Sequence, residues 1–296
     1  MSTINASLSD SIISEKAIEA FVVELQALSA FSTDFSDETS KIGATVQVPI
    51  PANITAGTAK NSYETEDTAV LNVATVPLTG YAKATVGITD EQFLNSSSAR
   101  LEKFAIQQAK AVARKIIVDA WANIINTNYS LKVTKALASL TTADIRAMRV
   151  LMSKADVPLS DRSLFLNPDA HDYIAGDTTV SLANAMAYGG TERIREGIVP
   201  RLLGFDVYES NIIPTTENLV GFAVHPSALA IAIRTLQPQA PGEYLEARVV
   251  KDEKTGIGLG YRRHYSQAKG THFCTFEAIY GSVKANTTGL VRLVTA

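Results

Sequence analysis

The stretch Asp161-Arg-Ser-Leu-Phe-Leu-Asn-Pro-Asp-Ala170 combines three structural signals within ten residues. The apolar run Ser163 to Leu166 predicts a short buried strand. Asn167-Pro168-Asp169 predicts a turn, because Asn and Asp side chains bond to nearby backbone and Pro fixes its own φ. A short helix is expected near His171. Strand, turn and helix in such close succession indicate a mixed α+β fold.

C-terminal to this stretch, strand signals dominate. A Gly/Thr/Ala-rich segment, 176–190, is predicted as loop, and 201–208 and 219–224 are predicted as strands. The small-residue run 226–233 fits either a helix or a strand. From Tyr244 onward the alternation of apolar and polar residues predicts three or four antiparallel strands.

N-terminal to it, helical spacing dominates. Thr141 and Asp144 are expected to open a helix that ends near Ala155, before Pro158. A longer helix is predicted from about Thr89 to Thr127. Thr89 is its expected N-cap, with Gln92 completing a capping box. An unbroken helix of that length would span about 55 to 60 Å, and a break near Asn95-Ser-Ser-Ser98 is the alternative.

The segment 43–88 changes to a period of two residues. Two predicted strands, 44–51 and 69–78, flank a polar stretch, and Pro49, Pro51 and Pro77 lie within or at the ends of these strands. Proline is tolerated in strands only at edges or bulges. The pattern predicts a long hairpin that is too thin to bury both faces within its own chain and therefore needs a partner surface.

The first convincing element of the chain is a helix from about Asp10 to Ser29. Its apolar stripe recurs at helical spacing and comprises Ile18, Phe21, Val22, Leu25 and Leu28. Two interpretations stay open: the stripe belongs to the core of this chain, which is the favoured one, or it docks on a neighbouring subunit. The polar segment 31–43 is predicted as a linker.

Composition narrows the class of protein. The chain has 296 residues, is 46% hydrophobic and 19% charged, and carries a net charge of −3. These values exclude wholesale disorder, collagen and coiled coil, and they argue against a protein that mainly coats nucleic acid. The single cysteine excludes an intramolecular disulfide. The absence of a long apolar run and of signal-peptide features predicts a protein made and folded in a cytoplasm.

Charge is unevenly distributed. Residues 1–80 carry three bases and ten acids, which gives −7, and the remaining residues carry 24 bases and 20 acids, which gives +4. An acidic N-terminal part and a mildly basic body suggest subunits that attract one another, although ordinary scatter of surface charge explains the pattern nearly as well.

No catalytic constellation is apparent, and we expect no catalytic, cofactor-binding or metal site. His264 and His272, with Cys274 and Glu277, offer the only local zinc ligands, and half-exposed sheet histidines with a small buried cysteine are the plainer interpretation. Gly256-Ile-Gly258-Leu-Gly260 is followed by a strand-like run, whereas a phosphate-binding glycine loop must open a helix. The basic residues Arg262, Arg263 and Lys269 fit phosphate contacts or plain exposure.

Three segments carry a resemblance to a known family. Asp161 to Ala170 is similar to the "D-R-x-L-x-L-N-P-x-A" strand and turn of the HK97-like major capsid proteins of tailed double-stranded DNA phages. Leu203 to Pro214 resembles the "G-F-x-V-x-x-S-x-x-x-P" stretch of that family, and His225 to Arg234 resembles its "F-H-P-S-A-L-A-x-A-x-R" segment. The order of elements extends the likeness to nearly the whole chain.

The resemblance implies an α+β HK97-like capsid fold with five parts. These are an N-terminal arm (1–42), an extended E-loop hairpin that reaches over a neighbour (43–88), the spine helix of the peripheral domain (89–127), an axial domain around the five- and six-fold centres (128–242), and a return to the peripheral sheet with a final strand (243–296). It also implies a protein of the virion capsid, assembled in the bacterial cytoplasm.

The resemblance further implies several partners. These are other copies of the chain in pentamers and hexamers, a separate scaffolding protein, a portal protein, a decoration protein in some relatives, and packaged double-stranded DNA contacted without sequence specificity. No membrane partner is expected. Some relatives form a Lys–Asn isopeptide bond, for which Lys60 is the only lysine near the hairpin tip.

Two alternatives remain at this point. One is an encapsulin-type bacterial shell, which shares the fold and encloses an enzyme. The other is a soluble α+β enzyme with the Gly256 to Gly260 loop in its site.

Overall fold

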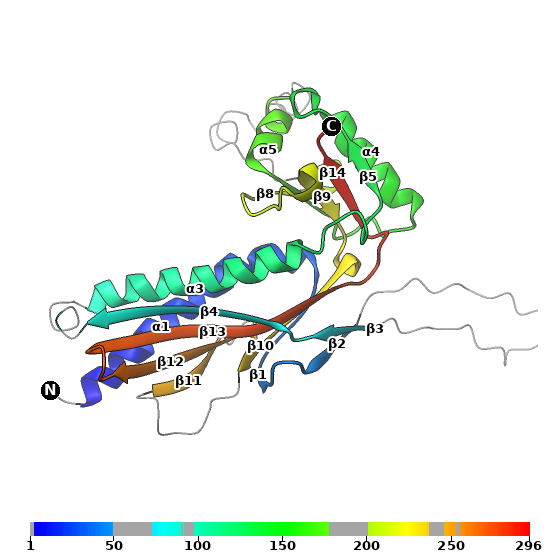
Figure 1. Cartoon of the computed structure of the whole chain (residues 1–296). Coiled ribbons are helices and arrows are strands. Elements are labelled where there is room, and N and C mark those ends of the chain that lie inside the picture. Colours follow the sequence, from blue (N-terminus) through cyan, green and yellow to red (C-terminus); the bar gives the residue numbers. More distant parts are fainter. Residues whose placement is uncertain are drawn as a thin grey trace, which may run out of the picture.

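The computed structural model describes residues 3–49, 73–89, 91, 98–177, 201–236, 246–252 and 255–296. Figure 1 shows two bodies. The elongated lower body has a sheet with two long helices along one face, and the smaller upper body has a second sheet with two shorter helices. The mixed composition of both bodies agrees with the expected α+β class.

The lower sheet is built mainly from the C-terminal part of the chain. Its strands run in the order β1-β10-β13-β12-β11, and β4 pairs with the opposite edge of β13. The bounds are β1 Ser32–Ser40, β4 Gly80–Thr89, β10 Leu229–Leu236, β11 Glu246–Lys251, β12 Gly258–Ser266 and β13 Thr271–Lys284. The predicted antiparallel strands of the tail are confirmed in β11, β12 and β13. Strand β10 follows a 3₁₀ turn at Pro226–Ala228, which decides the helix-or-strand alternative for 226–233 in favour of a strand.

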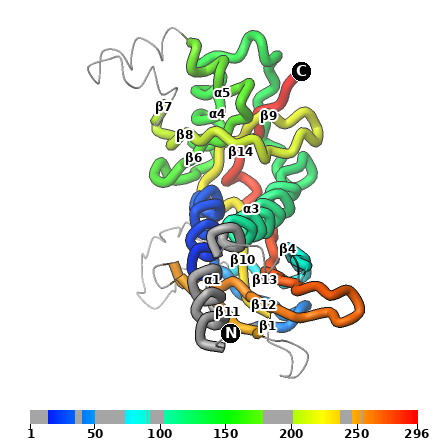
Figure 2. Tube along the Cα trace, turned by 90° about the vertical axis from the view of Figure 1, so that its left-hand side faces the viewer, coloured from blue at the N-terminus to red at the C-terminus, as the bar shows by residue number. Residues whose placement is uncertain are grey.

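Helices α1 (Thr3–Leu25) and α3 (Ser98–Trp121) lie side by side on this sheet (Figures 1 and 2). Ile18, Phe21 and Leu25 of α1 are buried against α3 and the sheet in one apolar cluster. The favoured interpretation of the N-terminal apolar stripe, a place in the core of this chain, is therefore confirmed.

The predicted linker at 31–43 is wrong, because residues 32–40 form β1 and pair in parallel with β10. The guanidinium of Arg234, which is buried, donates to the Asp34 carboxylate at 2.9 Å and to the Asp34 carbonyl at 2.8 Å. An edge strand needs only backbone pairing on one side, so its side chains stay polar and give no apolar alternation. Asp34 is therefore neutralised within the chain by Arg234.

Thr89 is the last residue of β4 and lies opposite Thr271, and the backbone of Glu91 is helical. The predicted cap at Thr89 with Gln92 adjoins residues 90 and 92–97, which lie outside the described residues, so it stays a prediction. Helix α3 begins at Ser98. This start agrees with the alternative of a break near residues 95–98. Its 24 residues span about 36 Å. Gly80 begins β4 opposite Tyr280, where a Cβ would lie 2.6 Å from the tyrosine ring, so a larger residue there would displace that ring.

The predicted hairpin is present at its base, where β2 (Thr45–Pro49) pairs antiparallel with β3 (Val73–Pro77). Val48, Val76 and Leu78 are nevertheless buried, against Ala230, Ala232 and Ile279 of the lower sheet. One face of the base is thus buried within the chain, while the alternate residues of both strands stay exposed or half-buried, which agrees with the expectation that the hairpin cannot bury both of its faces. The strand ends 50–51 and 69–72, the hairpin tip and Lys60 lie outside the described residues.

The upper sheet has the order β5-β14-β9-β6-β8-β7. Its bounds are β5 Lys132–Thr134, β6 Ser163–Leu166, β7 Arg201–Leu202, β8 Phe205–Glu209, β9 Leu219–Val224 and β14 Leu290–Val294. The predicted strand at 201–208 is two strands joined by Leu203 and Gly204, whose φ values are 52° and 88°. Two positive φ values in a two-residue loop are typical of the turn that best matches strand twist.

Two helices accompany this sheet, α4 (Thr142–Lys154) and α5 (Pro168–Ala175). Helix α4 has the predicted Thr141–Asp144 capping box. The Asn167 side chain caps α5 by accepting a 2.8 Å hydrogen bond from the backbone N–H of Ala170. Among the described residues, no helix is long and apolar enough to cross a membrane.

Substituting Asn167 with alanine removes this cap. We expect the free energy of unfolding to fall by about 1 kcal/mol, measured by urea denaturation of the subunit. The exposed Asn211, changed to alanine, is the control and should leave stability within about 0.5 kcal/mol of wild type. Equal stability of the two variants would contradict a capping role for Asn167.

Candidate assembly surfaces and the junction of the two bodies

An aromatic cluster joins the two bodies. The Trp121 ring, at the end of α3, lies 5.3 Å from Phe165 of β6 and 5.4 Å from Phe222 of β9. The Phe31 ring, next to β1, stacks 6.2 Å from Phe165. Aromatic pairs at these separations stabilise beyond the area that they bury. The upper body is therefore fixed to both the N-terminal segment and the long helix of the lower body.

A buried arginine forms the second link. Arg292 of β14 is only 2% exposed, and its guanidinium pairs with the Glu217 carboxylate. It also donates to the Tyr129 carbonyl at 3.0 Å and to Asn126 Oδ1 at 2.7 Å. Glu217 in turn accepts a 2.8 Å hydrogen bond from the backbone N–H of Asn126. These contacts tie the segment that leaves α3 to the last strand of the chain.

Sequence reasoning missed this network. The available signal was an arginine in the centre of the apolar strand Leu290-Val-Arg-Leu-Val294, since a buried charge needs a partner. The sequence does not identify Glu217 as its partner, because Glu217 lies in a turn, with a φ of 55°, 75 residues before Arg292.

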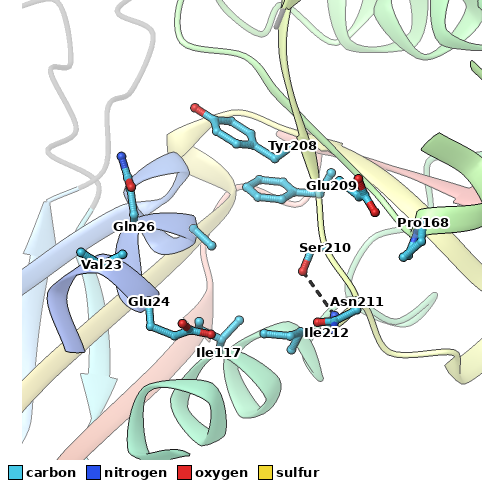
Figure 3. Close-up of a pocket in the computed structure, with 12 residues that line it drawn as sticks. Val23, Glu24, Gln26, Ile117, Pro168, Tyr208, Glu209, Ser210, Asn211 and Ile212 are labelled. Atoms are coloured by element: carbon cyan, nitrogen blue, oxygen red, sulfur yellow. Dashed lines mark hydrogen bonds between the residues drawn. The ribbon is translucent and has the colours of Figure 1, made fainter. Parts of the chain in front are cut away.

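A groove of about 600 Å³ lies where the bodies meet (Figure 3). One wall is the end of α1 with Ile117 of α3, and the other is Phe165, Pro168 and the segment from Tyr208 to Ile212. Val23 and Tyr208 on its rim are 67% and 45% exposed. The lining mixes apolar, amide and carboxylate groups and includes no cluster of groups suited to acid–base chemistry.

The histidines singled out in the sequence are not brought together. His264 lies opposite Phe273 in the β12–β13 ladder, so the next residue, His272, faces the other side of the sheet. His264 stacks on Phe273 at 5.1 Å, and His272 packs on Tyr265 at 4.7 Å. Among the described residues, no three His, Cys, Asp or Glu side chains are placed to hold a metal ion.

The remaining sequence candidates lie in ordinary sheet environments. Cys274 is half-buried and packs against the main core. Gly256 has a φ of 69° and belongs to the turn that leads into β12, so it does not open a helix. Arg262 pairs with the buried Glu277, which also accepts a 2.6 Å hydrogen bond from the Tyr81 hydroxyl.

Shifted pKa values reflect burial in the core. Burial raises the pKa of Tyr129, whose hydroxyl donates to the Ala228 carbonyl at 2.7 Å. Burial also raises the pKa of Tyr280, and a hydrogen bond to Asp119 adds to that effect. The pKa of His225 is lowered, mainly by burial, with Asp161 opposing and Arg162 adding to the decrease. All three groups thus stay neutral near pH 7 and support the fold.

The two-body α+β arrangement is the HK97-like fold of phage capsid proteins, as three solved structures show. The cyanophage P-SCSP1u capsid has a TM-score of 0.59 at 15% identity, over 90% of this chain and 86% of that one. The bacteriophage PhiM1 mature capsid has a TM-score of 0.57 at 11% identity, over 90% and 86%. Mycobacterium phage Che8 has a TM-score of 0.54 at 18% identity, over 85% and 84%. Comparison with curated proteins gives no match.

A family model described as phage capsid protein matches residues 73–273, about two thirds of the chain. The chain therefore belongs to the phage capsid protein family. It is a major capsid protein, a virion component whose many copies form the phage head. This membership favours the phage head over the encapsulin and soluble-enzyme alternatives.

Proposed function

We propose that this chain assembles as pentamers and hexamers into an icosahedral head that encloses double-stranded DNA. Its family membership and its two-body fold support the proposal. Small interfaces repeated many times by closed symmetry would supply the stability of such a shell. A net charge of −3 suits a container that holds DNA without reading its sequence.

The anchored base of the β2–β3 hairpin is the observation that carries this proposal. A Cβ at Gly281 would lie 2.2 Å from the Pro77 carbonyl oxygen, so β3 lies directly against β13. With Val48 and Val76 also buried there, the base is held firmly on the lower sheet. A segment that leaves from a fixed base has a defined starting point on the subunit, as an arm that bridges two subunits requires.

The parts of the subunit take the following proposed roles. Residues 1–42 form the N-terminal arm, although the residues from 14 to 34 contribute to this chain's own body, and 43–88 form the E-loop. Residues 89–127 include the spine helix, and 128–242 form the axial domain apart from β10, which like β4 of the E-loop segment belongs to the lower sheet. Residues 243–296 return to the peripheral sheet before the final strand, β14, which joins the upper sheet. The upper body would then surround the five- and six-fold centres.

Further partners follow from the same role. A separate scaffolding protein, a portal protein and possible decoration proteins would act with the chain during assembly in the bacterial cytoplasm. Packaged DNA would be contacted through its backbone alone. Neither a catalytic activity nor a cofactor is part of the proposal.

Particle formation tests the proposed function. The full chain, expressed alone and together with the scaffolding protein of the same phage, should give particles of megadalton size in gel filtration and closed shells in negative-stain microscopy. A monodisperse monomer under both conditions would be incompatible with a shell subunit.

A further inference from the structure

The side of α3 that faces away from the sheet carries an apolar stripe. Phe104, Ala111 and Val118 follow one another at intervals of seven residues, and all three are exposed. Phe104 and Val118 are 45% and 40% exposed. Figure 1 shows no described helix or strand over this side along most of α3. Residues seven apart lie on nearly the same line of a helix, with a drift of about 20° per interval.

Positive charge borders the stripe on both sides. Lys103, Lys110 and Arg114 lie along one border at spacings of seven and four residues and are exposed. Among the described residues they form no ion pair. Lys115 lies on the other border and pairs with Asp119 at 2.7 Å. An apolar seam with charged borders is the pattern by which one helix selects another of opposite charge.

The described helices of a second copy fit this surface poorly. Over residues 14–25, where its side chains are described, the apolar face of α1 is already buried in its own core. Helix α4 exposes Arg146, Arg149 and Lys154, which would repel the borders, and α5 has only eight residues. DNA fits poorly as well, because phosphates gain nothing from an apolar seam. An amphipathic helix with acidic flanks matches both the seam and its borders.

We propose that the exposed face of α3, defined by the stripe 104/111/118 and the cations 103, 110, 114 and 115, is the docking site for an acidic amphipathic helix of a separate protein. The inference rests on the proposed function, in which a scaffolding protein must hold the subunits transiently. Exposed ion pairs contribute little stability each and weaken further with salt. Binding through them suits a partner that later leaves the shell.

Binding of a peptide probe by the full-length subunit tests the site without any assembly step. The probe is a fluorescein-labelled peptide of about three heptads, with Leu at a and d and Glu at e and g. Fluorescence anisotropy should show that Lys103→Glu/Lys110→Glu/Arg114→Glu weakens binding at least tenfold. Phe104→Gln/Val118→Gln, which keeps the charge, should also weaken it. A peptide with Lys in place of Glu should bind the charge-reversed variant better than it binds wild type.

Helix α4 provides the matched control. Arg146→Glu/Arg149→Glu/Lys154→Glu makes the same change of charge on another exposed helix and should leave peptide affinity within about twofold of wild type. Equal loss in both triple variants, or no binding by wild type, would overturn the proposal. So would a duplex DNA probe that binds wild type and loses affinity on α3 charge reversal while the acidic peptide does not. If the wild-type chain forms particles but the α3 variants bind the peptide as well as wild type does, the docking site is rejected. The proposed shell function is unaffected by that result.

Discussion

Replacing Arg292 with methionine is expected to lower the free energy of unfolding by about 3 kcal/mol. Methionine fills much of the same volume but leaves the Tyr129 carbonyl and Asn126 Oδ1 without their donor and the Glu217 carboxylate without its counter-charge. Loss of one partner of a buried pair costs about 3 to 5 kcal/mol, and we take the lower end because Glu217 is 39% exposed and regains water. Urea denaturation of the unassembled subunit measures the change.

The exposed pair of Arg201 and Asp206 supplies the control. Its atoms are 3.6 Å apart and its side chains are 70% and 49% exposed, so Arg201→Met should change stability by no more than about 1 kcal/mol. An equal loss of stability in Arg292→Met and Arg201→Met would show that the buried network does not hold the last strand to the segment after α3.

Elements whose pattern is set by burial could be predicted from the sequence. The helix at 142–154, the short helix near His171 and the strands at 163–166 and 219–224 follow from spacing and turn chemistry, and the structure has them within a few residues. The stripe of Phe21 and Leu25 likewise identified a core helix. In each case the local signal and the tertiary contact agree.

Elements set by backbone pairing or by distant contacts could not be predicted in this way. Strand β1 has a polar sequence, and its place beside β10 follows from an alignment of segments 200 residues apart. The extent of β4 as far as Thr89 likewise follows from its pairing with the long β13.

The structure changes the interpretation of the uneven charge along the chain. Part of the N-terminal acidity is neutralised within the subunit, since Asp34 pairs with Arg234. The unpaired cations of α3 are the more conspicuous surface feature among the described residues. The charge of −7 over residues 1–80 therefore overstates the acidity that this part of the chain can offer to a partner.

Deleting residues 53–68 is expected to abolish particles and leave the subunit folded. The deletion keeps β2 and β3, whose buried side chains hold the hairpin base on the lower sheet. The seven residues that remain between Pro49 and Val73 (50–52 and 69–72) are enough to close a hairpin. Far-UV circular dichroism and the thermal midpoint of the subunit should therefore match wild type, while gel filtration shows no material of megadalton size.

A variant with the order of residues 53–68 scrambled separates the two ways in which the segment can act. It keeps the length and the net charge, so particles that form with a scrambled segment would mean that the span alone matters, and their absence would mean that specific side chains contact the neighbour. Unfolding of the deletion variant, or shells of normal yield from it, would show that the segment is not an inter-subunit arm. Because the anchoring residues Val48, Val76 and Leu78 stay in place in both variants, a change in assembly can be attributed to the segment beyond the base.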